Sequence, residues 1–211
     1  MGTVMRNVAA SQTQRRTAIV LALLALAESI PIVESLAGVR VIGFWPLGRI
    51  LTMPAAPLGW ILATIVAIAF IALTAARNSA IRSRLTEFGP LKPLALLLAL
   101  TSGITEELFF RGVVIEELAR HGADSLAQIA LSALVFGAVH VVWIGLAGPR
   151  GVIGVVGATT LLGAALAVVY LASGHSVVPC VVTHVAINAV LEPWLVLTAA
   201  ERRWGGAGRA A

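Results

Sequence analysis

Charged residues are scarce in this sequence of 211 residues. Asp, Glu, Lys and Arg together make up 12% of it, against about 25% in soluble globular domains. Hydrophobic residues make up 59%, and the mean hydropathy is +0.96. So few polar side chains cannot cover the surface of a folded chain in water, which excludes an ordinary soluble protein. We therefore expect an integral membrane protein.

Cysteine and acidic residues are also few. The single cysteine, Cys180, has no partner for a disulfide within the chain, and its apolar surroundings indicate a small core residue. The 15 Lys and Arg exceed the 10 Asp and Glu, which gives a formal net charge of +5. No basic patch with interleaved aromatic residues is present, so we expect no nucleic-acid partner. In a membrane protein, an excess of positive residues more often sets the orientation of the chain in the bilayer than it binds nucleic acid.

Long apolar runs predict the fold class, an all-α polytopic bundle of about six transmembrane spans of about 20 residues each. Residues 38–57 are rich in Pro, Gly and Trp and predict an interfacial or re-entrant connection. Pro179 and Pro193 are expected to interrupt the last span. The predicted spans cover residues 17–37, 58–76, 93–114, 126–146, 151–172 and 177–197.

The positive residues predict the orientation of the bundle. They concentrate in the N-terminal tail, in the loop at 77–92 and in the C-terminal tail, which lie on one side if there are six spans. Because Lys and Arg favour the cytoplasmic side, we expect both termini in the cytoplasm and a multi-pass protein of the plasma membrane. The chain divides into a tail with two spans at 1–92, a helical core at 93–198 and a polar tail at 199–211.

Two glutamates and an arginine lie in the third predicted span. Ionisable residues at this depth are costly and are functional candidates by default. Glu107 and Arg111 are four residues apart with the acid first, which favours an ion pair. Glu106 lies about 100° further round the helix, so it should be the less neutralised carboxylate.

Further polar residues lie in the fourth and sixth spans. His140 is alone in the fourth, whereas His184 and Asn188 share one helix face in the sixth. A carboxylate with a histidine can take a proton from water. A second histidine with an amide can donate hydrogen bonds to an oxyanion.

Structural interpretations of the same residues stay open. The Glu107–Arg111 pair can be purely structural, and His140, or His184 with Asn188, can link helices by hydrogen bonds. Three other glutamates lie nearer the span ends and are interpreted as interfacial or capping residues. They are Glu28, Glu34 and Glu192, the last beside an expected bend.

Three motifs follow one another along the core. Residues 106–111 have the form EExxxR, residues 136–140 the form FxxxH, and residues 184–188 the form HxxxN. In this the sequence resembles the CPBP family of intramembrane proteases, which includes the CAAX prenyl endopeptidases of the Ras-converting type and bacterial relatives linked to bacteriocin self-immunity. The resemblance covers about residues 93–197.

The resemblance implies an intramembrane endopeptidase acting on a membrane-associated peptide or protein. It makes Glu106 the general base that activates water, with His140 as its partner. It gives His184 and Asn188 the role of stabilising the oxyanion. The site is expected to line a water-filled cavity in a helical bundle, which makes 93–198 the catalytic core.

The resemblance also implies supporting residues. Glu107 and Arg111 would orient the site, in agreement with the ion pair expected from their spacing. Phe136 lies one helical turn before His140 and would pack behind the His140 ring.

A metal and two other functions remain open. Glu106, His140 and His184 could offer Zn²⁺ a carboxylate and two imidazoles. No HExxH is present, however, so we expect a metal-free mechanism without a cofactor. The alternatives to a protease are a non-catalytic membrane immunity or scaffold protein, and a proton-coupled transporter with the same three residues as a relay.

Overall fold

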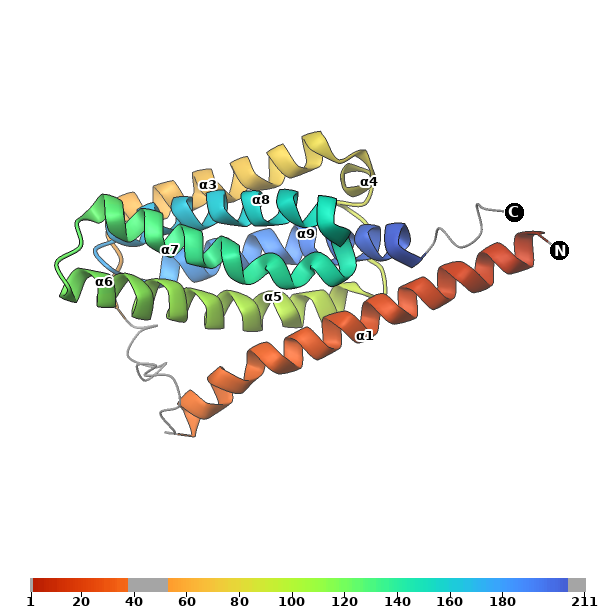
Figure 1. Cartoon of the computed structure of the whole chain (residues 1–211), viewed down its shortest axis with the longest axis horizontal. Coiled ribbons are helices and arrows are strands. Elements are labelled where there is room, and N and C mark those ends of the chain that lie inside the picture. Colours follow the sequence, from red (N-terminus) through yellow and green to blue (C-terminus); the bar gives the residue numbers. More distant parts are fainter. Residues whose placement is uncertain (1, 38–52, 205–211) are drawn as a thin grey trace.

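The computed structural model describes residues 2–37 and 53–204, and the regular secondary structure of these residues is helical throughout (Figure 1). Five helical stretches are long and apolar enough to cross a membrane: Ser11–Leu36, Pro57–Arg77, Lys92–Arg120, Ser125–Ala172 and Val178–Trp204. The predicted all-α membrane bundle is therefore confirmed. The elements are α1 (Gly2–Leu36), α3 (Pro57–Arg77), α4 (Ser79–Arg82), α5 (Lys92–Glu107), η1 (Leu108–Ile115), α6 (Glu116–Arg120), α7 (Ser125–Val139), η2 (His140–Trp143), α8 (Ile144–Ala172) and α9 (Val178–Trp204).

The stretch Ser125–Ala172 folds back on itself. Its backbone leaves helical geometry at Gly148, with φ 73° and ψ 172°, a conformation open to glycine. Beyond this turn α8 packs antiparallel to α7, since Gly137 faces Thr160 while Gly163 faces Ala133. The stretch thus holds two membrane-length segments, which matches the two separate apolar runs predicted there.

Helix α1 lies obliquely across the rest of the bundle. It packs on α5 and α9, and Figure 1 shows it diverging from the other helices toward its C-terminal end. The described ends of the chain lie at the same end of the bundle, where the Arg16 guanidinium is 5.4 Å from the ring centre of Trp204. A chain that crosses the membrane an even number of times must have both ends on one side, as seen here. That this side faces the cytoplasm stays a prediction.

Apolar side chains point both inward and outward, as expected in lipid. One buried cluster joins α3, α8, α9 and the π-helical segment, and a second joins α1, α5 and α9. Large aliphatic side chains also cover the outer surface, where only a bilayer makes their exposure favourable. Examples are Leu23, Leu26, Ile65, Ile68, Leu134, Ile153 and Leu161.

The predicted interruption of the last span is wrong. Helix α9 runs without a break from Val178 to Trp204. Pro179 is its second residue, where a missing backbone N–H leaves no helical hydrogen bond unmade. Pro193 is accommodated inside the helix, which extends seven residues beyond the predicted end at 197. Most of the connection predicted at 38–57 lies outside the described residues.

The third membrane segment changes helix type within the EExxxR motif. Helix α5 ends at Glu107, and Leu108–Ile115 forms a π-helix before α6 resumes the α conformation. A π segment has wider turns and occurs mostly at functional sites. On its inner side, the Ser132 hydroxyl of α7 donates to the Phe110 carbonyl at 3.2 Å. No pattern in the sequence predicts this segment.

Candidate active site

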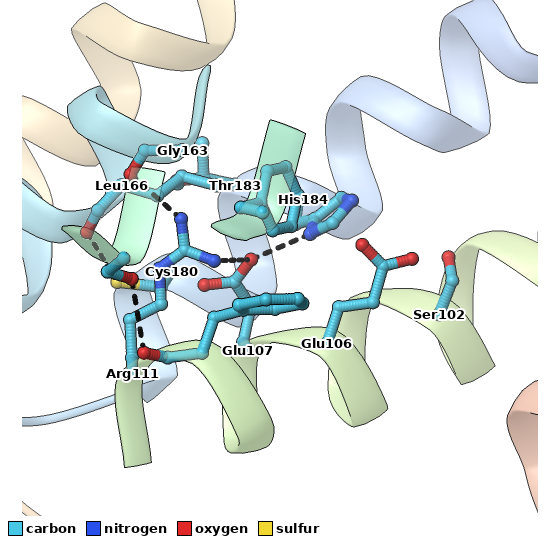
Figure 2. Close-up of polar contacts among 12 residues, drawn as sticks. Ser102, Glu106, Glu107, Arg111, Gly163, Leu166, Cys180, Thr183 and His184 are labelled. Atoms are coloured by element: carbon cyan, nitrogen blue, oxygen red, sulfur yellow. Dashed lines mark hydrogen bonds and ion pairs between the residues drawn. The ribbon is translucent and has the colours of Figure 1, made fainter. Parts of the chain in front are cut away.

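The centre of the bundle holds a fully buried ion pair. Nη1 of Arg111 lies 3.1 Å from Oε1 of Glu107, and neither side chain is exposed (Figure 2). Nη2 of Arg111 donates to the Gly163 carbonyl of α8 at 2.9 Å. The guanidinium also lies 4.9 Å from the ring centre of Phe136, within range of a cation–π interaction. The ion pair predicted from the spacing is therefore present, and it ties α5 to α7 and α8.

His184 contacts the same carboxylate oxygen. Its Nδ1 lies 2.7 Å from Oε1 of Glu107 (Figure 2). Because a carboxylate accepts, the proton of this hydrogen bond belongs to Nδ1, and Nε2 is left for another partner. Glu107 thus orients both Arg111 and His184, a contact between α5 and α9 that spacing along one helix cannot predict.

Glu106 is turned away from this ion pair. Its Oε2 atom is buried and has no hydrogen-bond partner among the described residues. The nearest basic atom is Nε2 of His140, at 3.9 Å. Nδ1 of His140 lies 2.7 Å from the Phe136 carbonyl, which requires a proton on Nδ1 and leaves Nε2 an acceptor when the ring is neutral. Oε2 of Glu106 and Nε2 of His140 are thus two acceptors that face each other. A water molecule between them can donate a hydrogen bond to each.

The Phe136 ring packs against both histidines. Its centre lies 4.9 Å from the His140 ring and 5.8 Å from the His184 ring, and the residue is fully buried. One rigid aromatic side chain therefore fixes the spacing of both imidazoles. The resemblance implies this packing against His140; the contact with His184 is additional.

Asn188 approaches α5 one helical turn beyond His184. Its Nδ2 donates to the hydroxyl of Ser102 at 3.3 Å. Ser102 in turn precedes Glu106 by one turn on α5, and Figure 2 shows the two side by side. Sequence reasoning did not single out Ser102, and the signal that could have found it is its four-residue spacing from Glu106.

A cavity of about 560 Å³ opens beside Glu106 and His140. His184 and Asn188 are not among its lining residues, but Asn188 contacts Ser102, which lines it. Its walls come from α1, α5, α7, α8, α9 and the π- and 3₁₀-helical segments. The lining residues are Val20, Leu24, Glu28, Pro31, Leu98, Ser102, Thr105, Glu106, Phe109, Phe110, Val139, His140, Val142, Trp143, Leu146 and Glu192.

The interpretation of Glu28 and Glu192 as interfacial or capping residues is wrong, because both line this cavity. Helix α1 crosses α5 obliquely and brings Glu28 to the depth of the motif, where its backbone carbonyl accepts from Thr105 at 2.7 Å. Glu192 lies well inside α9, because that helix continues past Pro193. Apolar runs in the sequence reveal neither the tilt of α1 nor the residue at which α9 ends.

The side chains considered for zinc do not form a metal site. Within the described parts of the chain, no three His, Cys, Asp or Glu side chains are grouped so that they could hold a metal ion. His184 directs Nδ1 to Glu107, so this ring nitrogen is not available as a ligand. We therefore derive no step of the chemistry through a metal.

Comparison with known families finds a match for the segment that contains the motif residues. Residues 89–190 match the family model described as Type II CAAX prenyl endopeptidase Rce1-like. This match supports recognition of the chain as a CAAX-protease-type protein. All the motif residues, from Glu106 to Asn188, lie within the Rce1-like segment, whereas Glu28 and Glu192 lie outside it. No curated protein and no solved structure gives a significant match to the chain.

The match to the Rce1-like family model supports an intramembrane CAAX-protease-type function. Together with the five apolar helical stretches, it makes the chain a multi-pass membrane protein. The family also implies a peptide substrate and a lipid bilayer as surroundings.

Proposed function

We propose that this protein is an intramembrane endopeptidase that hydrolyses a peptide bond of a membrane-associated peptide or protein. The observation that carries the proposal is the position of Glu106. Its unpartnered carboxylate oxygen faces Nε2 of His140 at 3.9 Å, at the wall of a cavity large enough for a peptide segment. A buried carboxylate in lipid is costly, and an unpartnered one is rarely only structural.

The first step uses a water held between Glu106 and His140. Glu106 takes a proton from this water as its oxygen attacks the peptide carbonyl, which breaks an O–H bond and forms a C–O bond. General-base catalysis of this kind contributes about 10²–10⁴-fold. The Nδ1–H of His140, held by the Phe136 carbonyl, keeps its Nε2 directed at the water.

The second step breaks the tetrahedral intermediate. His184, with both ring nitrogens protonated, and the Asn188 amide donate to the oxyanion, and Glu107 supplies the counter-charge for the His184 ring. As the carbonyl re-forms, the C–N bond breaks. Glu106 returns its proton to the leaving nitrogen, so the products are a carboxylic acid and an amine.

The apolar cavity walls serve the same chemistry. Phe109, Val139 and Trp143 line the space beside the two catalytic candidates. Such walls admit an apolar peptide segment and limit bulk water, so the hydrogen bonds to the oxyanion act in a low-dielectric site.

The proposal is tested by cleavage in a purified system. Protein in detergent micelles is incubated with a panel of membrane-tethered peptides, and products are identified by mass spectrometry. We expect cleavage of at least one peptide, its loss in Glu106→Gln, and a large decrease in His140→Ala. Glu34→Gln, also on a membrane-spanning helix but outside the cavity, is the matched control and should cleave like the parent.

Folding of each variant is checked by size-exclusion chromatography and circular dichroism. If folded Glu106→Gln and His140→Ala cleave as fast as the parent, the protease proposal fails. A scaffold or immunity protein would instead keep its biological effect in Glu106→Gln and cleave none of the peptides.

A further inference from the structure

The cavity contains more negative charge than the proposed reaction uses. Glu28 from α1 and Glu192 from α9 line it in addition to Glu106. The Glu192 residue is half-buried, and its Oε2 atom is buried with no hydrogen-bond partner among the described residues. Hydrolysis needs one general base, so two carboxylates remain without a role.

Few cations are available to neutralise these two carboxylates. His184 attracts both of them electrostatically, but it does not line the cavity and its Nδ1 is bound to Glu107. The lining residues include no Lys or Arg, and His140 is their one basic member. The nearby guanidinium of Arg111 is already bound to Glu107 and to the Gly163 carbonyl. Carboxylates at membrane depth are normally paired, so Glu28 and Glu192 can each take up a proton or bind a cationic group of a ligand.

The remaining walls of the cavity indicate what kind of ligand fits. They are mostly aliphatic and aromatic, and they include Leu24, Leu98 and Trp143. A ligand that satisfies both kinds of surface has an apolar body and one positively charged group. A lysine or arginine side chain of an otherwise apolar peptide has this composition, because its long aliphatic stem packs on apolar walls while its head carries the charge.

We propose that Glu28 and Glu192 form a subsite that binds the cationic side chain of a lysine or arginine in the peptide substrate. This inference rests on the proposed function and adds a substrate class to it. Both residues lie outside the segment that matches the family, so the preference belongs to this chain and to the helices that frame its core. The subsite lies in the same cavity as Glu106 and would place the scissile bond at a fixed distance from the bound cation.

The first test compares matched peptides on the parent protein. Membrane-tethered peptides carry lysine or norleucine at one position, which is moved along the sequence in successive pairs. Norleucine keeps the apolar stem and lacks the charge. Because a hydrogen bond to a charged group stabilises more than a neutral one, we expect a lysine-to-norleucine ratio of kcat/KM of about tenfold or more at one position. A ratio near one at every position overturns the inference.

The second test assigns the preference to the two carboxylates. In Glu192→Gln and in Glu28→Gln, the lysine-to-norleucine ratio should fall toward one. The matched controls are Glu201→Gln on α9, whose carboxylate binds Arg84 at the surface, and Glu34→Gln on α1. Both controls should keep the parent's ratio. An unchanged ratio in folded Glu192→Gln and Glu28→Gln assigns the preference elsewhere and overturns the proposal.

A third test does not depend on cleavage. Dodecylammonium chloride and dodecanol share one apolar chain and differ in charge, and their binding to the parent protein is followed by isothermal titration in maltoside micelles. We expect dodecylammonium to bind at least about tenfold more tightly, and Glu192→Gln to remove the difference. Equal binding of the two compounds to the parent overturns the subsite. Charge-selective binding without cleavage of any peptide would support the subsite and refute the protease.

Discussion

Nδ1 of His184 lies 2.7 Å from Oε1 of Glu107, the oxygen that also binds Arg111. The two adjacent glutamates are therefore divided between different tasks. Glu107 is fully buried and holds two basic side chains, while Glu106 keeps a free oxygen at the cavity wall. The division follows from helix geometry, since neighbouring side chains point about 100° apart.

The ion pair should be needed for folding. Removing one partner leaves a buried charge without a counter-charge, so Glu107→Leu or Arg111→Met alone should cost about 3–5 kcal/mol of unfolding free energy. The double variant should recover most of this loss, because a buried pair replaced by apolar side chains is often tolerated. Dodecyl sulfate titration in mixed micelles measures the unfolding free energy.

The same double variant should stay inactive, because His184 has then lost the acceptor of its Nδ1–H. This separates a stabilising role from an orienting one. Full recovery of both stability and cleavage would show that Glu107 and Arg111 serve only to hold the helices together.

Contact between α7 and α8 should depend on Gly137. A Cβ at this position would overlap Oγ1 of Thr160 and lie 3.1 Å from the Val156 carbonyl oxygen. Gly137→Ala should therefore separate the helices, lower the unfolding temperature and displace His140 on the same segment. Gly154→Ala, where no atom lies within 4 Å of the added Cβ, is the matched control.

Rescue of Gly137→Ala can locate the clash. Adding Thr160→Ala removes the closest atom and should restore part of the unfolding temperature and of the cleavage rate. If Gly137→Ala alone melts like the parent, α7 and α8 do not approach each other closely at this point.

Asn188 should affect the rate of the chemical step. Loss of one donor to an oxyanion lowers kcat about 10²–10³-fold, so Asn188→Ala should lower kcat by this amount with little change in KM. Ser102→Ala should have a smaller effect, because Ser102 only accepts a hydrogen bond from Asn188. Steady-state kinetics on the best peptide measure both constants, and an unchanged kcat in Asn188→Ala would remove it from the mechanism.

Metal chelators should leave the activity unchanged. The described residues offer no group of three ligating side chains, and one ring nitrogen of His184 is occupied by Glu107. Cleavage after dialysis against a strong chelator should therefore match the untreated rate, with less than one metal ion per chain by elemental analysis. Loss of activity that is restored by added Zn²⁺ would contradict the metal-free mechanism.

Local patterns in the sequence predict much of this arrangement. The apolar run at 58–76 anticipates α3 within one residue at each end, because a transmembrane helix needs continuous hydrophobicity. The i,i+4 spacing of Glu107 and Arg111 anticipates their ion pair, because positions four apart share a helix face. The π-helix at 108–115 and the uninterrupted α9 were not predictable, since both depend on how neighbouring helices pack.

The sequence alone determined that this chain is a helical membrane protein, where its apolar segments run, and which motif residues come in which order. Those features depend on composition and on spacing along one helix. Only the tertiary structure decided that Glu107 holds His184, that Phe136 packs against two imidazoles, and that Glu28 and Glu192 share a cavity with Glu106. These contacts join different helices, and they are set by the tilt of α1 and by close packing at glycines rather than by any local pattern.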